Sequence, residues 1–323
     1  MNICVVGHGM MGKIHSDALR QVDCRLHTLV GRRPEPAAEF AQQYGYHKWT
    51  ISLEEALADP AVDAIILANP SELHAATALA ALAHGKHVLV EIPIAMSLTE
   101  AEQVVAAAEQ AGLRLGVVHP MRMQPEMVLL RDRLRTGNEF ARHVGGRFFI
   151  HRLENVGATG YQRSWVDNLL WHHMAHLVDF GLWMLGESVT EVHSAMSPLD
   201  PMTHTPMEVF LGVETAQHQT LVCTGSYYSR ERIFEVHVVT THNSYRADYF
   251  TNKLWLGSGM TISAPWEENC ARVTRDFIHA LHTRRAPAIE GRSVLPTMKI
   301  LQMVQDRWDQ RYGVQALPGR PLS

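Results

Sequence analysis

The first 120 residues alternate short apolar runs with segments of helical periodicity, and this alternation limits the folds open to the chain. The apolar runs cover residues 3–6, 26–30, 64–68, 87–90 and 115–118, and helical patterns cover residues 71–84 and 98–110. The apolar runs are continuous, as expected of strands that are buried on both faces. Strands that alternate with helices indicate parallel βαβ units, so we predict a doubly wound parallel sheet.

The pattern changes after His119. Helices are expected at residues 125–135, 166–185, 266–284 and 294–312, and strands at residues 147–152, 189–195, 207–213, 219–226, 233–240 and 245–250. Consecutive strands without intervening helices favour an antiparallel sheet. We therefore predict two domains, a nucleotide-binding domain at 1–120 and a substrate-binding domain at 121–323. The second is expected to be an α/β domain with an open, mainly antiparallel sheet through which the chain forms a homo-oligomer.

Composition narrows the classes of function. Lys and Arg number 29 against 33 Asp and Glu, which gives a formal charge of −4 and no global attraction for nucleic acid or anionic membranes. The four cysteines lie far apart with no CxxC pair, which fits a reducing compartment. The sequence shows no run of about 18 apolar residues and no targeting signal. We expect a cytoplasmic protein.

A glycine string follows the first predicted strand directly and reads Gly7-His8-Gly9-Met10-Met11-Gly12. In a Rossmann domain, Gly7 would permit a tight turn, Gly9 would let a pyrophosphate approach the backbone, and Gly12 would let the helix pack closely on the strand. The helix N-terminus would then face the phosphate charge. The string predicts a dinucleotide site that also involves Met10 and Met11, the alternative being a glycine-rich turn without a ligand.

The end of the second predicted strand indicates which dinucleotide binds. NAD sites usually place Asp or Glu there to bind the ribose 2′-OH, but this chain has Gly31-Arg32-Arg33. Two guanidinium groups, from Arg32 and Arg33, can pair instead with a 2′-phosphate. We predict NADP as the cofactor. The alternative is a solvated basic turn and NAD binding without the acidic contact.

Two further strings resemble the glucose-fructose oxidoreductase/inositol dehydrogenase/MocA (Gfo/Idh/MocA) family. They are Asn-Pro-Ser-Glu-Leu-His at 69–74 and Gly-Lys-His-Val-Leu-Val-Glu-Ile-Pro at 85–93. The resemblance implies a Rossmann domain, then an α/β domain with an open antiparallel sheet, and an NAD(P)-dependent dehydrogenase acting on a CH–OH group. It also implies cofactor contacts from Asn69, Pro70, His74, Glu91, Pro93 and His119.

The resemblance implies a catalytic site that is only partly present. A family lysine that polarises the substrate hydroxyl corresponds to Ile92, and a family aspartate corresponds to His172. His176 matches the histidine that accepts the hydroxyl proton. Because His172 and His176 lie four residues apart on one predicted helix, both can face one pocket. We predict His176 as the base and His172 as its catalytic partner in contact with substrate; core histidines or a zinc site, which lacks an evident third ligand, are the alternatives.

The string at 163–173, together with Glu-Ile-Pro at 91–93, resembles one branch of the family. That branch oxidises a carboxylated cyclic hemiacetal to a pyrone lactone during bacterial degradation of aromatic compounds, with reduction of NADP. A hemiacetal hydroxyl is more acidic than a simple alcohol because the ring oxygen withdraws electrons, so one imidazole can serve as the base. The resemblance implies substrate contacts from Arg122, Arg152, Arg163 and Trp165. Asp167 either joins them or orients a histidine, and no metal is expected. Guanidinium groups suit carboxylates.

Two other functions remain open from the sequence. One is a sugar, cyclitol or dihydrodiol dehydrogenase of the same family. The other, of a different class, is a non-catalytic dinucleotide-binding regulator, which the missing lysine favours and the retained His176 opposes.

Overall fold

The computed structural model describes residues 1–137, 139–157, 160, 162–186 and 188–313, and the chain divides into two compact units. The first unit contains Met1–Val118, Val156–Arg163 and Cys270–Leu295. The second contains His119–Asn155, Ser164–Asn269 and the described residues from Pro296 onward. The expected boundary at residue 120 lies beside the change of unit after Val118. Residues 270–295, which we had assigned to the second domain, return to the first unit.

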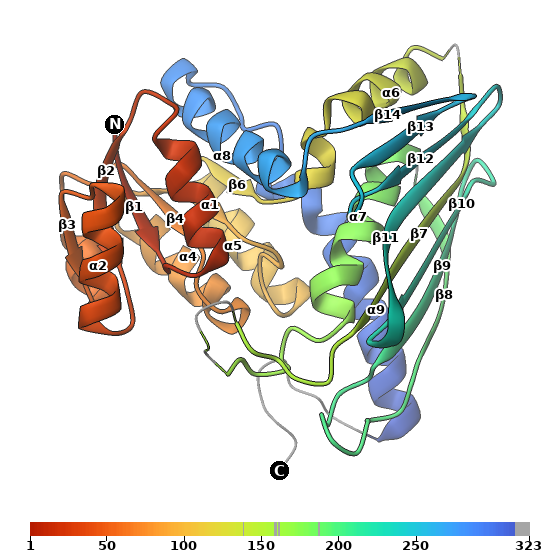
Figure 1. Ribbon diagram of the computed structural model, residues 1–323, viewed down its shortest axis with the longest axis horizontal. Coiled ribbons are helices and arrows are strands. Elements are labelled where there is room, and N and C mark those ends of the chain that lie inside the picture. The colour runs from red at the N-terminus through yellow and green to blue at the C-terminus, as the bar shows by residue number, and fades with distance from the viewer. Residues whose placement is uncertain (138, 158–159, 161, 187, 314–323) are drawn as a thin grey trace. The chain divides into compact units, whose positions relative to one another are not determined.

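The first unit is built on a six-stranded parallel sheet in the order β3-β2-β1-β4-β5-β6 (Figure 1). Its strands are β1 (Asn2–Val6), β2 (Arg25–Val30), β3 (Lys48–Thr50), β4 (Ala64–Leu67), β5 (His87–Val90) and β6 (Leu115–Val117). This order reverses direction at β1, where doubly wound sheets bind their ligands. The Rossmann prediction is confirmed, although the sequence pattern missed the three-residue edge strand β3.

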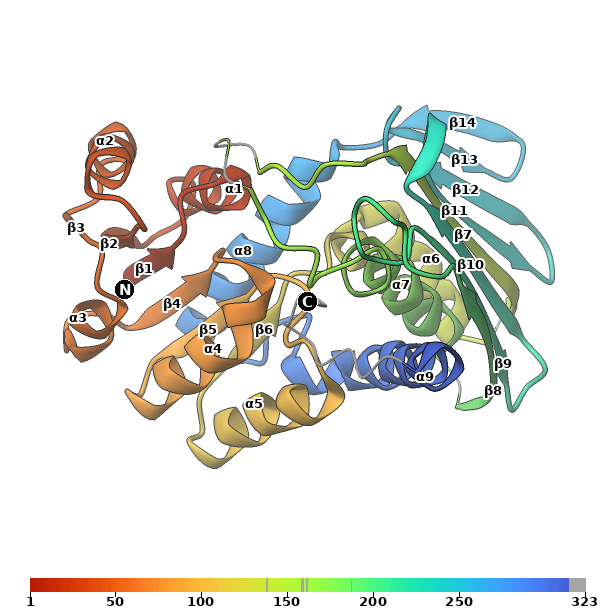
Figure 2. The same ribbon diagram turned by 90° about the horizontal axis from the view of Figure 1, so that it is seen from below.

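Helices cover both faces of this sheet. Figure 2 shows α1 (Met10–Leu19) and α2 (Pro34–Tyr44) on one face, and α4 (His74–Ala83) and α5 (Leu98–Gln110) on the other. The short helices α3 (Leu53–Ala58), η1 (Ser71–Leu73) and η4 (Gly291–Val294) complete the connections. Polar side chains fix two helix starts, since Ser52 and Ser97 each accept a hydrogen bond from the backbone three residues on.

The returning segment, residues 270–295, closes the first unit. It carries most of α8 (Trp266–Thr283) and then runs along β6, where Val117 N donates to Ile289 O at 3.1 Å and Gly116 forms a β-bridge with Glu290. This pairing covers a sheet edge that would otherwise expose unpaired backbone groups.

The second unit is built on an eight-stranded sheet in the order β14-β13-β12-β11-β7-β10-β9-β8 (Figure 1). Its strands are β7 (Ala141–His151), β8 (Val189–Met196), β9 (Glu208–Thr215), β10 (Thr220–Ser226), β11 (Tyr228–Thr240), β12 (Ser244–Asp248), β13 (Lys253–Leu256) and β14 (Gly259–Ile262). Every neighbouring pair is antiparallel except β7 and β10, which run parallel. The prediction of an open, mainly antiparallel sheet is confirmed.

Figure 2 shows the helices of this unit on one face of its sheet. They are η2 (Pro120–Met123), α6 (Pro125–Arg135), the π-helical turn η3 (Leu170–Met174), α7 (Ala175–Leu185) and α9 (Leu295–Tyr312). The predicted helix start at residue 166 is wrong. The helical turn begins after Asn168, whose Oδ1 accepts a hydrogen bond from Leu170 N at 2.9 Å.

Glycines bring α7 against the sheet. A Cβ atom on Gly181 of α7 would lie 2.3 Å from Leu221, and one on Gly146 of β7 would lie 3.0 Å from Leu177. Because hydrogen atoms occupy these places, helix and sheet approach each other closely. This contact fixes the helix that carries His176 and Asp179, which directly follows the turn η3 that carries His172.

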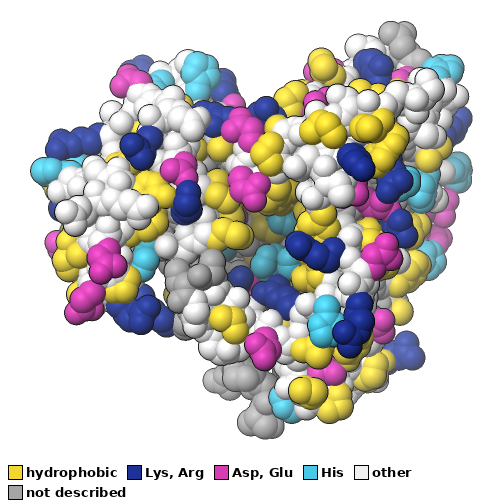
Figure 3. Space-filling view, in the orientation of Figure 1, with side chains coloured by type: hydrophobic (Ala, Val, Ile, Leu, Met, Phe, Trp, Pro, Cys, Tyr) yellow, Lys and Arg dark blue, Asp and Glu magenta, His cyan; other side chains and the backbone are white. Residues whose placement is uncertain are grey.

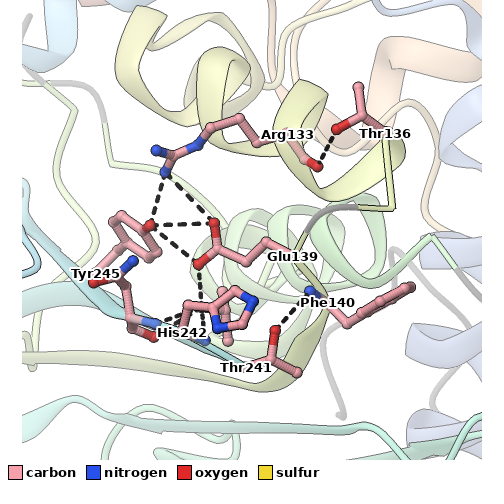
Figure 4. A network of polar contacts seen from close by, with 9 residues as sticks. Arg133, Thr136, Glu139, Phe140, Thr241, His242 and Tyr245 are labelled. Atoms are coloured by element: carbon pink, nitrogen blue, oxygen red, sulfur yellow. Dashed lines mark hydrogen bonds and ion pairs between the residues drawn. The ribbon is translucent and has the colours of Figure 1, made fainter.

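A polar network joins α6 to strands β11 and β12 of the same sheet (Figure 4). Glu139 is 6% exposed and accepts hydrogen bonds from Thr240 and from Tyr245, whose hydroxyl also accepts from Arg133 at 2.7 Å. Arg133 lies on α6, whereas Thr240 and Tyr245 lie on β11 and β12. The network gives the buried carboxylate its partners and ties three elements together.

Two surface properties bear on function. On the face drawn in Figure 3, Lys and Arg side chains are interspersed with Asp and Glu, in keeping with the small net charge. Among the described residues, no helix is both long enough and apolar enough to cross a membrane.

Candidate active site

The glycine loop of the first unit leaves room where a dinucleotide needs it. Gly7 has φ of 106°, and a Cβ atom there would lie 2.4 Å from Ala68 O. A Cβ atom on Gly12 would lie 2.2 Å from Gly7 O, whereas nothing lies within 4 Å of one on Gly9. Gly9 is the N-cap of α1 and provides no side-chain hydrogen bond to the helix. The loop therefore has open space beside free amide groups at a helix N-terminus, which fits a pyrophosphate.

The structure places the other predicted cofactor residues of this unit around the ends of its strands. Arg32 and Arg33 are exposed at the turn between β2 and α2, and Met10 is 60% exposed at the start of α1 beside Met11. Pro70 begins the turn η1 that follows β4. These residues surround the place where the sheet order reverses.

Two of the residues predicted to bind the cofactor, His74 and Glu91, are buried and contact other groups of the protein. The ring of His74 is buried and bridges two strand ends, with Nδ1 2.7 Å from Pro93 O and Nε2 2.9 Å from Asn69 O. Glu91 Oε1 lies 2.9 Å from His15 Nε2. We therefore regard His74 and Glu91 as positioning residues for the loops that would hold the cofactor.

His15 was missed by sequence reasoning. It is fully buried on α1, and its other nitrogen, Nδ1, lies 2.8 Å from Thr274 Oγ1 on α8. The resulting chain from Glu91 through His15 to Thr274 joins a strand end to two helices. A contact between residues 259 positions apart leaves no local pattern in the sequence.

In the second unit, His176 lies buried on α7 between two rings. The centroid of His119 is 6.0 Å away at an interplanar angle of 81°, and that of Trp266 is 5.0 Å away at 89°. Burial lowers the pKa of His176 well below its ordinary value, and the positive charges that His119 and His172 can carry lower it further, while Asp179 opposes them. His176 is therefore a neutral imidazole at neutral pH, as a general base must be.

A buried carboxylate, Asp179, lies one turn further along α7. It accepts hydrogen bonds from Arg122 Nε at 2.7 Å and Nη2 at 2.5 Å, and from Thr297 Oγ1 at 3.2 Å. His119 Nδ1 lies 3.1 Å from the same carboxylate. Burial, reinforced by Arg122, lowers the pKa of His119 well below its ordinary value. Asp179 thus lies beside the ring that packs against His176.

This network changes the roles expected of two residues. Arg122 was expected to bind a substrate carboxylate, but it is 7% exposed and already forms a two-pronged pair with Asp179. His119 was expected to contact the cofactor, and the structure places its ring beside Asp179 and His176 in the second unit. The sequence indicated both residues but not Asp179, their common partner.

His172 and His173 form a parallel stack on η3. Their ring centroids are 4.1 Å apart at 4°, and His173 stacks in turn on Phe148 at 3.8 Å and 14°. His172 Nδ1 lies 3.3 Å from Asp167 Oδ2, while His173 Nδ1 lies 2.7 Å from the Tyr227 hydroxyl. Asp167 is thus placed to orient His172.

Arg152 is held at the end of β7 by aromatic and polar neighbours. Its guanidinium carbon lies 5.4 Å from the ring centroids of both Trp165 and Tyr227. One Nη donates to Asn155 Oδ1 and the other lies 3.4 Å from the Tyr227 hydroxyl. Tyr227 therefore joins Arg152 to His173. Arg163 belongs to the first unit, next to a β-bridge between Val156 and Gln162.

The structure thus brings the predicted residues of the second unit into two linked clusters. His176 groups with His119, Arg122 and Asp179, and the stack of His172 and His173 leads through Tyr227 to Arg152 and Trp165. Among the residues that the structure describes, no group of three or more His, Cys, Asp or Glu side chains could hold a metal ion. The arrangement provides a neutral imidazole for proton transfer and a fixed guanidinium for anion binding.

Comparison with known proteins identifies the family of the chain. The model of an oxidoreductase family with an NAD-binding Rossmann fold matches residues 1–119, and that of a C-terminal domain of bacterial oxidoreductases matches residues 125–258. The chain is 33% identical over 225 residues to 4-carboxy-2-hydroxymuconate-6-semialdehyde dehydrogenase of Sphingobium sp. strain SYK-6, an alignment that covers 69% of this chain and 70% of that protein. It is 27% identical over 182 residues to scyllo-inositol 2-dehydrogenase (NAD(+)) of Bacillus subtilis, covering 49% and 52% of the two chains.

Solved structures show the same fold. Levoglucosan dehydrogenase in complex with NADH and levoglucosan superposes with a TM-score of 0.83 at 18% identity, covering 96% of this chain and 97% of that one. GenD2 from gentamicin A biosynthesis, in complex with NAD, gives a TM-score of 0.81 at 22% identity, with coverage of 95% and 93%. With its two family matches and its relative at 33% identity, the chain belongs to the Gfo/Idh/MocA family of NAD(P)-dependent oxidoreductases.

Proposed function

We propose that the protein is an NADP-dependent dehydrogenase that oxidises the hydroxyl of a carboxylated small molecule, of the type of 4-carboxy-2-hydroxymuconate-6-semialdehyde in its cyclic hemiacetal form. The observation that carries the proposal is the buried, neutral His176 of the second unit, in a chain that has Ile92 at the position of the family lysine. A single imidazole suffices for a hemiacetal, which gives up its hydroxyl proton more readily than a simple alcohol. The product would be a pyrone lactone, formed in the degradation of aromatic compounds.

The mechanism divides the work among the described residues. NADP, when bound at the loop from Gly7 to Gly12, supplies the hydride acceptor. His176 takes the hydroxyl proton, and we assign this transfer to Nε2 because Nδ1 is buried and has no hydrogen-bond partner among the described residues. The ring of His119, which lies beside Asp179, packs edge-on against the His176 ring and limits its orientation.

Substrate recognition would depend on Arg152. Its contacts with Asn155, Tyr227 and Trp165 hold the guanidinium in place before substrate arrives, so little side-chain freedom is lost on binding. A carboxylate can then pair with the remaining donors. Arg163, on the Arg-Ser-Trp string that resembles the branch, is proposed as a second carboxylate contact, and His172 as a third substrate contact.

A substrate panel tests the proposal. The protein is incubated with NADP and either a dicarboxylated hemiacetal, myo-inositol or levoglucosan, and absorbance of the reduced cofactor is followed at about 340 nm. We expect the anionic hemiacetal to give the highest kcat/KM, and Arg152→Ala or Arg163→Ala to raise KM with little change in kcat. Faster turnover of inositol or levoglucosan would support a sugar or cyclitol dehydrogenase instead.

The cofactor preference has its own test. Dissociation constants for NADP and NAD are measured by quenching of protein fluorescence for the wild type and for Arg32→Asp. We expect tighter binding of NADP, and a loss of at least about tenfold in that preference when the charge at residue 32 is reversed. Equal constants for the two cofactors in the wild type would contradict the proposal.

We also propose that a second copy of the chain covers the open face of the sheet in the second unit. α7 packs on the other face. The open face carries Phe210, which is 42% exposed, and Glu235, which pairs with Arg147 and Arg246 from neighbouring strands. Sedimentation equilibrium should give at least a dimer, and a monomer at all concentrations would contradict this.

The four free cysteines of the protein suit the cytoplasm, which we propose as its location.

A further inference from the structure

His8 occupies the position between the first two glycines of the loop, and its side chain lies over the end of β2. A Cβ atom on Gly31 would lie 3.2 Å from both Cε1 and Nδ1 of its ring. The ring also packs against Phe40 of α2, with centroids 5.9 Å apart at 56°. The imidazole therefore lies between the glycine loop and Gly31, the residue before Arg32 and Arg33.

The surroundings of this imidazole are unusual for a polar ring. Nδ1 is buried and has no hydrogen-bond partner among the described residues. Burial, and then the positive charges of Arg33 and Arg32, lower the pKa of His8. Its neighbours Gly31 and Phe40 carry no charge, so the two arginines are the charged groups that face it. In the protein alone, the ring is neutral beside two cations.

A phosphate placed at this turn would reverse the electrostatics. A phosphomonoester carries about −1.5 to −2 charges near neutral pH, and its oxygens accept strong hydrogen bonds. It would offset the two guanidinium charges and offer an acceptor to the ring. NAD has a hydroxyl at the same position and brings no such charge.

We infer that His8 is a proton-linked specificity residue, which takes up a proton from solvent when NADP binds and donates a hydrogen bond to the 2′-phosphate. This inference rests on the proposed preference for NADP and assigns part of that preference to a residue outside the arginine pair. It follows that the preference for NADP over NAD increases as the pH falls from about 8 toward 6.5, where the imidazole titrates. Below about pH 6 the phosphate itself becomes protonated and the trend ends.

The test uses two ligands that differ only in the 2′-phosphate, adenosine 2′,5′-bisphosphate and adenosine 5′-monophosphate. Binding to the full-length protein is measured by isothermal titration calorimetry at pH 7.5 in two buffers of different ionisation enthalpy, which gives the number of protons exchanged. We expect net proton uptake with the bisphosphate that is larger in the wild type than in His8→Gln. The His8→Gln variant should also bind the bisphosphate about tenfold more weakly, as for loss of a hydrogen bond to a charged group.

Controls separate this inference from the proposal on which it rests. Affinity for the monophosphate should be unchanged in His8→Gln, and His47→Gln, an exposed imidazole of the same unit, should behave as the wild type does. Absence of proton uptake in the wild type overturns the inference without any variant. If His8→Gln binds the bisphosphate normally while Arg32→Asp does not, the inference fails and the NADP preference stands. If neither variant affects binding, both fail.

Discussion

The candidate cofactor site in the first unit consists mainly of backbone, whereas the candidate catalytic site in the second consists of buried side chains that hold one another. Gly7, Gly9 and Gly12 contribute space and amide groups, and the charged residues nearby are exposed. His119, His176 and Asp179 are each at most 8% exposed, and they act through their mutual contacts. The cofactor site depends on the space that its glycines leave open, and the catalytic site depends on contacts between buried side chains.

This difference explains how one family can keep its cofactor and change its substrate. A backbone site tolerates changes at most surrounding positions, provided that its glycines remain. A site of buried side chains that contact one another changes its chemistry when a single member changes, and the second unit has such a change at His172, which corresponds to a family aspartate. Function therefore varies in the second unit while the first keeps its role.

The largest expected effect concerns the base. His176→Ala should lower kcat by about 10²–10⁴-fold, since that is the usual contribution of a positioned general base. Steady-state kinetics at saturating substrate measures the change. Cofactor affinity, which depends on the other unit, should stay within about twofold of the wild type. Near-normal turnover in this variant would place proton transfer elsewhere, with His172 as the next candidate.

The second effect concerns the buried ion pair between Asp179 and Arg122. Asp179→Ala should reduce the free energy of unfolding by about 3–5 kcal/mol, because it leaves the Arg122 guanidinium buried without its counter-charge. Chemical denaturation followed by circular dichroism measures this loss. Glu109→Ala is the matched control, since its pair with Arg292 is exposed and its removal should change stability far less. Equal losses from the two substitutions would contradict a special role for the buried pair.

A pair of glycine substitutions tests the backbone site. Gly12→Ala should reduce stability by about 1–3 kcal/mol, because the new methyl group would overlap Gly7 O. Gly9→Ala meets no protein atom, so it should leave stability nearly unchanged while weakening dinucleotide binding at least about tenfold. Thermal melting and fluorescence titration separate the two effects. If Gly9→Ala binds NADP normally, the pyrophosphate does not approach that residue.

The smallest effect is a pH dependence of stability. Burial lowers the pKa values of His119 and His176 in the folded protein, so the unfolded chain binds more protons below about pH 6.5. Stability from these groups is therefore present above that pH and is lost as the pH falls, by up to about 1.4 kcal/mol per pH unit for each histidine. His176→Gln should make this slope shallower in urea denaturation between pH 5 and 7. An unchanged slope would mean that His176 is not held neutral.

Sequence reasoning succeeded where the determinants are local. The strand before Gly7, the turn through Gly9 and the helix after it are specified within a few residues, so periodicity and glycine spacing predict them. It failed where the signal is short or interrupted. Gly145 and Gly146 break the apolar pattern of β7, so the predicted strand at 147–152 began six residues after the observed start at Ala141.

The side-chain partners were harder still. The sequence indicated His176, His119 and Arg122, each through a resemblance to its family, but their connection through Asp179 requires the fold. His15 and Thr274 are 259 positions apart, so their contact forms only when distant parts of the chain come together. Periodicity reports which face of an element is buried, but it does not report which residue lies opposite.

The returning segment has a consequence for synthesis. The strands of the first unit are complete by Val117, yet their edge is covered by Ile289 and Glu290, and His15 receives its partner from α8. A chain emerging from the ribosome thus produces the nucleotide-binding sheet early and must keep its edge at β6 unpaired while about 170 more residues are added, which takes roughly 10–30 s at ordinary elongation rates. The last part of the first unit to form is encoded after nearly the whole of the second, so neither unit corresponds to a continuous stretch of the gene.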